Sequence, residues 1–217
     1  MGGWWVESVL HNQGPVALAS WIFWVLFSIT LHELAHGWTA LRQGDTTPRD
    51  LQRLTLNPVV HMGPFSLIMF AICGIAWGVM PVDPYRFRDG TRGEVQVAAA
   101  GPAMNLSLAV VALGLGAVVT WILGPSDTAR EIKLFFYYGL FLNLLLCLFN
   151  LLPVIPLDGS RILAAVWMPF RRLTMHENAH LFGLGVLALI VFTPIGGTIV
   201  GLIAVVANTT FDAACRW

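Results

Sequence analysis

The sequence predicts an all-α, polytopic membrane protein with about five transmembrane helices and one re-entrant or interfacial segment. Two observations support this fold class. Hydrophobic residues make up 57% of the 217 residues and charged residues only 11%, whereas a soluble domain carries about 25% charged residues. The hydrophobic residues also gather in long runs, as expected of helices that cross a hydrocarbon layer about 30 Å thick.

The longest apolar runs predict three spans in the first two thirds of the chain. The first covers about residues 16–41, and about 26 helical residues would extend roughly 39 Å. Two more spans are expected over about residues 95–123 and 132–155. A run over residues 65–80 is at or below the short limit for a span and contains two glycines. We therefore expect it to be re-entrant or interfacial and not to cross.

Two shorter apolar runs follow near the end of the chain. They cover residues 179–193 and 195–211 with a Thr-Pro pair between them, and we expect a C-terminal helical hairpin over residues 179–211. Nothing repeats at a regular period, so we expect a single integral-membrane domain over residues 1–217 with its core in 16–170. The formal net charge is zero, which gives no reason to expect a nucleic-acid partner.

Basic residues predict the topology. Nine of the twelve Lys and Arg lie in loops 42–64 and 81–94 or shortly after Asp158, and the positive-inside rule places such loops in the cytoplasm. Residues 1–15 contain no Lys or Arg and are expected outside, without a cleavable signal peptide. The hairpin would return Arg216 to the cytoplasm. Small size favours a prokaryotic plasma membrane.

The sequence HELAH at residues 32–36 is the sharpest chemical signal. Residues four apart share one face of a helix, so His32 and His36 can bind one Zn²⁺ together. Glu33 projects beside them and can act as a general base on a water. Ionisable groups inside a span are costly, so we favour a metal site over two buried histidines that merely pack.

A second match to the same pattern, HENAH at residues 176–180, has to be weighed against the first. It follows two arginines at the polar start of an apolar run, so His176 and His180 are expected at the membrane interface. Glu177 is favourable there because it lies near a helix N-terminus. We favour HELAH as the catalytic pair, because metal electrostatics are stronger where water is restricted.

A catalytic zinc usually has three protein ligands, and Asp158 is the best candidate for the third. It follows an apolar span that Pro153 and Pro156 interrupt, and Gly159 lets the backbone turn. Unwound backbone at membrane depth is tolerated where it is buried in protein or lines a wet cavity. Asn150 lies at the end of the same span, where its amide could stabilise an oxyanion or bond between helices.

In combination, these motifs resemble the site-2 protease family of intramembrane zinc metalloproteases, in its minimal form without PDZ or CBS domains. The resemblance runs from about residue 28 to 170 and rests on HELAHG, RLTLNP, AAAGPxxN and FNLLPxxPLDGxR. It implies a site-2 protease-like core and one Zn²⁺ per chain, with His32, His36 and Asp158 as ligands. Glu33 would be the catalytic acid and base, and Asn150 a substrate or oxyanion contact.

Two further elements of the resemblance concern the middle of the chain. Asn105 matches the Gly-Pro-x-x-Asn element of the middle span, where Gly101 would also let helices approach closely. Many short family members have His-x-Asp-Pro where this chain has His61-Met62-Gly63-Pro64. The aspartate is therefore replaced by Gly63, which leaves the role of His61 open.

The function expected from these residues is hydrolysis of peptide bonds in or near transmembrane segments. Zinc would activate a water, and Glu33 would accept its proton. The partners would be transmembrane protein substrates and the lipid bilayer; the sequence does not predict an oligomeric state. A membrane metal-handling or transport protein and an inactive family member that only binds membrane proteins are the alternatives.

Overall fold

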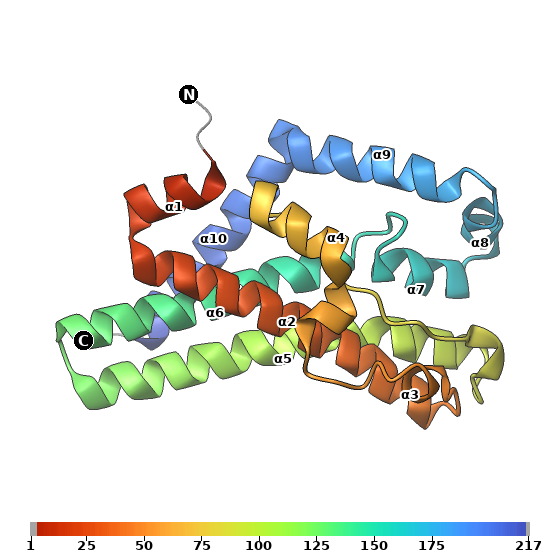
Figure 1. Cartoon of the computed structure of the whole chain (residues 1–217), viewed down its shortest axis with the longest axis horizontal. Helices are drawn as coiled ribbons and strands as arrows, with labels where there is room; N and C mark the ends of the chain where they lie inside the picture. Colours follow the sequence, from red (N-terminus) through yellow and green to blue (C-terminus); the bar gives the residue numbers. More distant parts are fainter. Residues whose placement is uncertain (1–3, 216–217) are drawn as a thin grey trace.

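A bundle of long helices forms the molecule, as Figure 1 shows for the computed structural model, which describes residues 4–215. All the regular elements within these residues are helices. Four are long and apolar enough to cross a membrane, and a bent pair of shorter helices could supply a fifth span. The predicted all-α polytopic fold is therefore confirmed.

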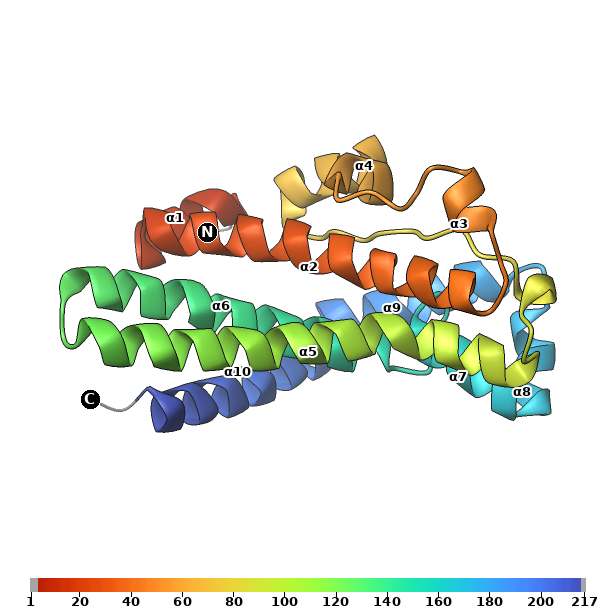
Figure 2. The same cartoon turned by 90° about the horizontal axis from the view of Figure 1, so that it is seen from below.

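Three long helices form the centre of the bundle. They are α2 (Pro15–Arg42), α5 (Thr91–Leu123) and α6 (Asp127–Asn150), and α5 packs along both of the others. Figure 2 shows these helices running nearly side by side. The first two match the predicted spans closely, whereas α6 begins and ends about five residues before its predicted bounds.

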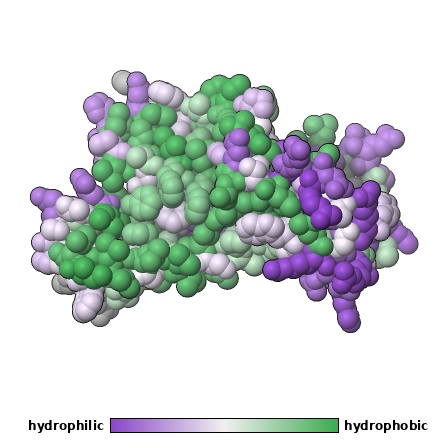
Figure 3. All heavy atoms as spheres, turned by 60° about the horizontal axis from the view of Figure 1, so that its bottom comes forward, coloured by the Kyte–Doolittle hydropathy of each residue, from purple (hydrophilic) through white to green (hydrophobic). Residues whose placement is uncertain are grey.

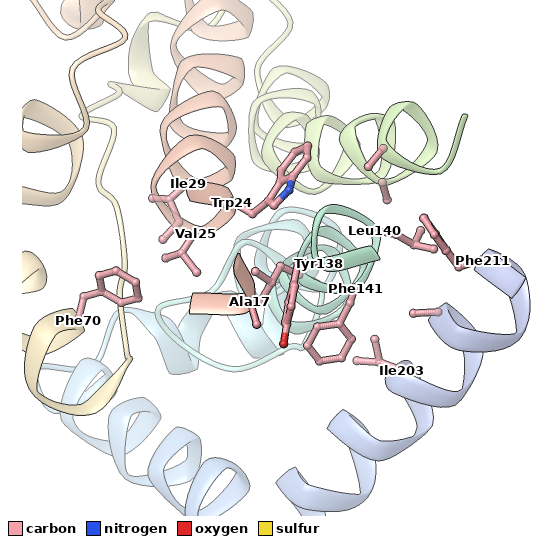
Figure 4. Close-up of a cluster of buried hydrophobic side chains, with 14 of the residues drawn as sticks. Ala17, Trp24, Val25, Ile29, Phe70, Tyr138, Leu140, Phe141, Ile203 and Phe211 are labelled. Carbon is pink, nitrogen blue, oxygen red and sulfur yellow. The ribbon is translucent and has the colours of Figure 1, made fainter. Parts of the chain in front are cut away.

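The side chain of Trp24 joins α2 to α6. The indole nitrogen of Trp24 donates a 2.8 Å hydrogen bond to the carbonyl of Phe135. A Cβ added to Gly139 would lie 2.5 Å from the Trp24 ring, so the two helices can approach this closely only because Gly139 has no side chain. Figure 4 shows Trp24 beside the helix that carries Tyr138 and Phe141.

The chain unwinds between α6 and α7 (Asp158–Val166). Pro153 and Pro156 lie in this stretch, and proline cannot donate the hydrogen bond that a continuing helix needs. Asp158 is therefore the first residue of a new helix that follows the break expected from the two prolines.

A short kinked helix and an extended return follow α2. The kink in α4 (Pro58–Cys73) is at Gly63, whose φ of 67° is in the left-handed region, so the Gly that replaces the usual aspartate permits a bend. Residues 74–83 then return in an extended conformation, held by a 3.0 Å hydrogen bond from the Val79 N–H to the His61 carbonyl. The chain leaves α2 through α3 and returns to the start of α5 at the same end of the bundle (Figure 2). This is the course expected if the stretch between them does not cross the membrane.

The helix α1 (Trp5–Gln13) was not expected from the sequence. It is short and mixes polar with apolar residues, so it has no long apolar run. Indole nitrogens of Trp4 and Trp5 donate hydrogen bonds of 2.7 and 3.2 Å to the carbonyl of Ala71. These bonds tie α1 to the end of α4.

Three helices form the tail: α8 (Met168–Thr174), α9 (Ala179–Phe192) and α10 (Pro194–Ala214). The bend between α8 and α9 is 100°, and α10 is long and apolar enough to span alone. The tail therefore adds one long span and one short apolar helix.

The predicted hairpin over residues 179–211 is not what the structure shows. A hairpin would bring the end of α10 back to where α9 begins. The start of α9 lies at the C-terminal end of α6, where a Cβ on Gly183 would meet Ile155. The end of α10 lies at the opposite end of α6, where Lys133 forms a 3.5 Å ion pair with Asp212. The physical reason is that α10 packs along α6 and not back along α9.

Hydrophilic side chains gather at one end of the molecule. Figure 3 shows an apolar surface over most of this face and a polar cap at the end where Figure 1 places α3 (Thr47–Asp50) and α8. This is the end to which the arginine-rich loops belong. Arg216, expected in the cytoplasm, lies outside the described residues.

Cysteine labelling tests this topology. On a background without the native cysteines, we expect Arg49→Cys and Thr91→Cys to label from the cytoplasmic side. We expect Thr128→Cys and Ala213→Cys to label from the outside, because both lie at the other end of the bundle. Labelling of Ala213→Cys from the cytoplasm would restore the hairpin and contradict the course of α10 described here.

Candidate metal centre

Two histidines of α2 converge on one point. His32 and His36 lie one turn apart, which places both rings on the same face, and their Nε2 atoms are 3.0 Å apart. Both side chains are buried, with 7% and 5% of their surface exposed. A helix therefore supplies two imidazole nitrogens at the spacing that one metal ion needs.

Asp158 completes the cluster from a distant part of the sequence. Its Oδ2 lies 3.1 Å from His32 Nε2 and 3.3 Å from His36 Nε2. Because Asp158 is the first residue of α7, the positive end of that helix dipole stabilises its carboxylate. Among the described residues, these three side chains form the one group of potential ligands close enough to share an ion.

The hydrogen-bond partners of the two imidazoles are those expected of metal ligands. His36 Nδ1 lies 2.6 Å from the carbonyl of Val97, and a carbonyl can only accept, so Nδ1 carries the proton and Nε2 presents a lone pair. His32 Nδ1 lies 2.6 Å from Asn105 Oδ1. With both Nδ1 atoms protonated, neutral imidazoles aim two lone pairs at the carboxylate, and Asp158 Oδ2 has no hydrogen-bond donor.

Zinc suits this arrangement by geometry and by ligand type. Tetrahedral zinc with bonds of about 2.0–2.1 Å to nitrogen and oxygen holds its ligands about 3.3–3.4 Å apart. The three measured separations are 3.0, 3.1 and 3.3 Å. Two imidazoles and a carboxylate are also a donor set found at catalytic zinc.

Two glycines let other segments close over the cluster. A Cβ on Gly101 of α5 would clash with the Nε2 atoms of both His32 and His36, and a Cβ on Gly78 would lie 2.6 Å from the Glu33 carboxyl oxygen. Glu33 is 6% exposed. Gly101 was noted in the sequence only for helix packing. The contact of Gly78 had no sequence signal, because it joins segments whose proximity depends on the fold.

The other candidate residues lie apart from the cluster or at its edge. Asn150 is the last residue of α6, and its amide donates a 2.9 Å hydrogen bond to the Leu146 carbonyl of the same helix. His61 is buried and bonds through Nε2 to the carbonyl of Thr55 at 2.6 Å. It therefore supports the loop before α4.

The second histidine pair does not form a comparable site. His176 precedes α9 in a turn and His180 lies in its first turn, so the two do not occupy successive turns of one helix. Both are exposed. Within the described part of the chain, neither belongs to a group of three potential metal ligands.

Comparison with known proteins gives one family and several relatives. The model of the family described as "Peptidase family M50" matches residues 20–193. "Putative zinc metalloprotease YwhC" of Bacillus subtilis is 36% identical over 187 residues, which cover 84% of this chain and 84% of that protein. "Putative zinc metalloprotease Rip2" of Mycolicibacterium smegmatis is 33% identical over 153 residues, which cover 66% of this chain and 54% of that protein. Rip2 of Mycobacterium tuberculosis H37Rv is 30% identical over 149 residues, with the same coverage. No solved structure matches.

Replacing Gly101 tests the geometry of the cluster. We expect Gly101→Ala to reduce the bound zinc of the purified protein severalfold or more, because the added methyl group would occupy the space between the two imidazoles. The matched control is Gly114→Ala on the same helix, where a Cβ meets nothing within 4 Å. Equal zinc content in both variants, measured by metal analysis, would contradict the predicted site.

Proposed function

The chain belongs to peptidase family M50, the site-2 protease family of membrane metalloproteases, and on this premise we propose that it is a zinc endopeptidase. Its substrates are membrane proteins, cut in or near their transmembrane segments. The proposed zinc ligands are His32, His36 and Asp158, one ion per chain.

One observation carries the proposal: three lone-pair atoms converge beside Glu33 inside a bundle of apolar helices. The ligand atoms lie within 4.8 Å of one another, and Glu33 follows His32 directly in α2. A metal-handling path would distribute such ligands along a route through the membrane. Here they meet at one point with a carboxylate in the position of a base, which favours hydrolysis.

The residues divide the chemistry between them. A zinc ion held by the cluster would supply Lewis acidity, which acidifies a water and polarises the scissile carbonyl. Glu33 accepts the proton of the attacking water and later donates it to the leaving amine. Asn150, at the point where α6 unwinds, donates its amide to the substrate or to the oxyanion.

The position of the site in α2 indicates where a substrate is cut. His36 precedes the last residue of α2 by six residues, or roughly 9 Å at 1.5 Å per residue. This end of α2 leads into the arginine-rich loops, so cleavage falls in the half of the membrane nearer the cytoplasm. A transmembrane helix satisfies its own peptide groups, so the substrate must unwind locally. Residues 54–58 are a candidate strand for pairing with it.

Glu33→Gln separates this proposal from its alternatives. Gln preserves the shape of the side chain but cannot transfer a proton, so we expect at least a hundredfold loss of cleavage of a model transmembrane substrate with zinc content unchanged. Turnover within tenfold of the wild type would mean that Glu33 is not the base. Absence of cleavage by the wild type, with zinc bound, would favour the inactive or metal-handling alternatives.

Asn150→Ala tests the second catalytic assignment. If the amide stabilises an oxyanion, we expect kcat to fall by about 100-fold with little change in KM. Ser107→Ala is a matched control, because Ser107 also bonds to a carbonyl of its own helix four residues earlier, at 2.8 Å, and is exposed on α5. Full activity of Asn150→Ala in detergent would make Asn150 a packing residue.

A further inference from the structure

Two buried asparagines connect His32 to the backbone of α6. Asn105 of α5 lies with its Oδ1 2.6 Å from His32 Nδ1, and its Nδ2 donates a 3.0 Å hydrogen bond to Asn143 Oδ1 on α6. Asn143 Nδ2 in turn donates a 2.8 Å hydrogen bond to the carbonyl of Gly139. The chain of bonds therefore crosses three helices and ends on a backbone oxygen.

That last oxygen determines the direction of every bond in the chain. A carbonyl oxygen can only accept, so Asn143 must turn its NH₂ group toward Gly139 and its oxygen toward Asn105. Asn105 must then donate to Asn143 with its NH₂ group, which turns its own oxygen toward His32. An amide oxygen also only accepts, so His32 must carry a proton on Nδ1, and in the neutral ring this leaves the Nε2 lone pair free.

Burial prevents either amide from taking the opposite orientation. Both asparagines have 0% of their surface exposed, so bulk water does not reach a misoriented amide, and a buried polar group without a partner is unfavourable. Each has at least one hydrogen bond at its oxygen and one at its nitrogen. The close approach of α6 to α2 at Gly139, described above, keeps the third helix within reach.

We propose that Asn143 is a positioning residue that fixes the amide of Asn105 and thereby selects the zinc-binding tautomer of His32. Its side chain bonds to Asn105 and to the Gly139 carbonyl and not to His32, His36 or Asp158, so it acts through Asn105. The inference rests on the zinc site of the proposed function, but it concerns only this chain's own hydrogen bonds. Asn143 belongs to none of the motifs in the sequence.

Removing the amide of Asn143 should allow the amide of Asn105 to take either orientation. In Asn143→Leu, Asn105 Nδ2 loses its acceptor and gains nothing by facing α6. The amide is then free to rotate by 180° and present NH₂ to His32 Nδ1, which favours the tautomer protonated on Nε2. That tautomer has no lone pair on Nε2, the nitrogen that faces the proposed metal position. We therefore expect zinc affinity to fall 10- to 100-fold, as is typical when a residue that hydrogen-bonds to a metal ligand is replaced.

The experiment measures zinc affinity and the tautomer separately. Zinc dissociation constants come from competition with a chelating dye on purified full-length protein in detergent. The tautomer comes from ¹⁵N NMR of metal-free protein with labelled histidines, with the His32 signals assigned by their loss in His32→Gln. We expect the proton on Nδ1 of His32 in the wild type and a substantial population with the proton on Nε2 in Asn143→Leu.

Two variants separate orientation from general damage. The neutral carboxyl of Asn143→Asp offers the same acceptor to Asn105 and the same donor to Gly139, so it should retain zinc affinity within about threefold. Thr120→Val removes a buried 2.7 Å bond from a side chain to its own helix at a site remote from the cluster. It should leave both readouts unchanged.

Specific results would overturn the proposal. Wild-type zinc affinity in Asn143→Leu, or equal losses in Asn143→Leu and Asn143→Asp, would do so. If Asn143→Leu does not fold, the wild type still decides, because a neutral His32 whose only ring proton is on Nε2 contradicts the direction of the chain. Neither readout requires cleavage of a substrate, so a failure of the proposed protease function would be recognised separately.

Discussion

Three lone-pair atoms meet within 3.3 Å of one another inside apolar helices, and much of the surrounding structure serves this meeting. Without a cation the arrangement is unfavourable, because buried polar groups need partners. The helix α2 supplies two of the proposed ligands, the first turn of α7 supplies the third, and α5 accepts a hydrogen bond from Nδ1 of each imidazole. Each helix of the central bundle is therefore tied to the site by at least one polar contact.

Glycine permits the contacts that bring these elements so close. At Gly101, Gly78 and Gly139 a Cβ would clash with His32 and His36, with Glu33 and with Trp24 respectively. Helices in a membrane gain little from hydrophobic burial against one another, so close packing and interhelical hydrogen bonds hold them together. In this chain two of these close approaches, at Gly101 and Gly78, lie at the proposed site itself.

The sequence allowed the long helices and the ligand set to be predicted, because both depend on local patterns. Apolar length predicts α2 and α5, and the four-residue spacing of His32 and His36 depends only on helix geometry. The hairpin was wrong because apolar runs show length and not direction, and α10 follows α6 through contacts with residues far away in the sequence. Asn143 was missed for a similar reason: a single amide in an apolar helix has no periodicity, and its partner is 38 residues away.

Glu33 and the three proposed ligands are buried, at 5–7% exposure, and this limits access to the proposed site. In the proposed reaction a peptide bond has to reach these buried groups, so turnover would require the covering segment to move first. The extended segment over Glu33 is held near it by few bonds, among them those of Ser66 to the backbone of Trp77 at 2.7 and 2.9 Å. The rate of the proposed reaction would then be the intrinsic rate multiplied by the open fraction, so each 1.4 kcal/mol that favours closure would lower it about tenfold.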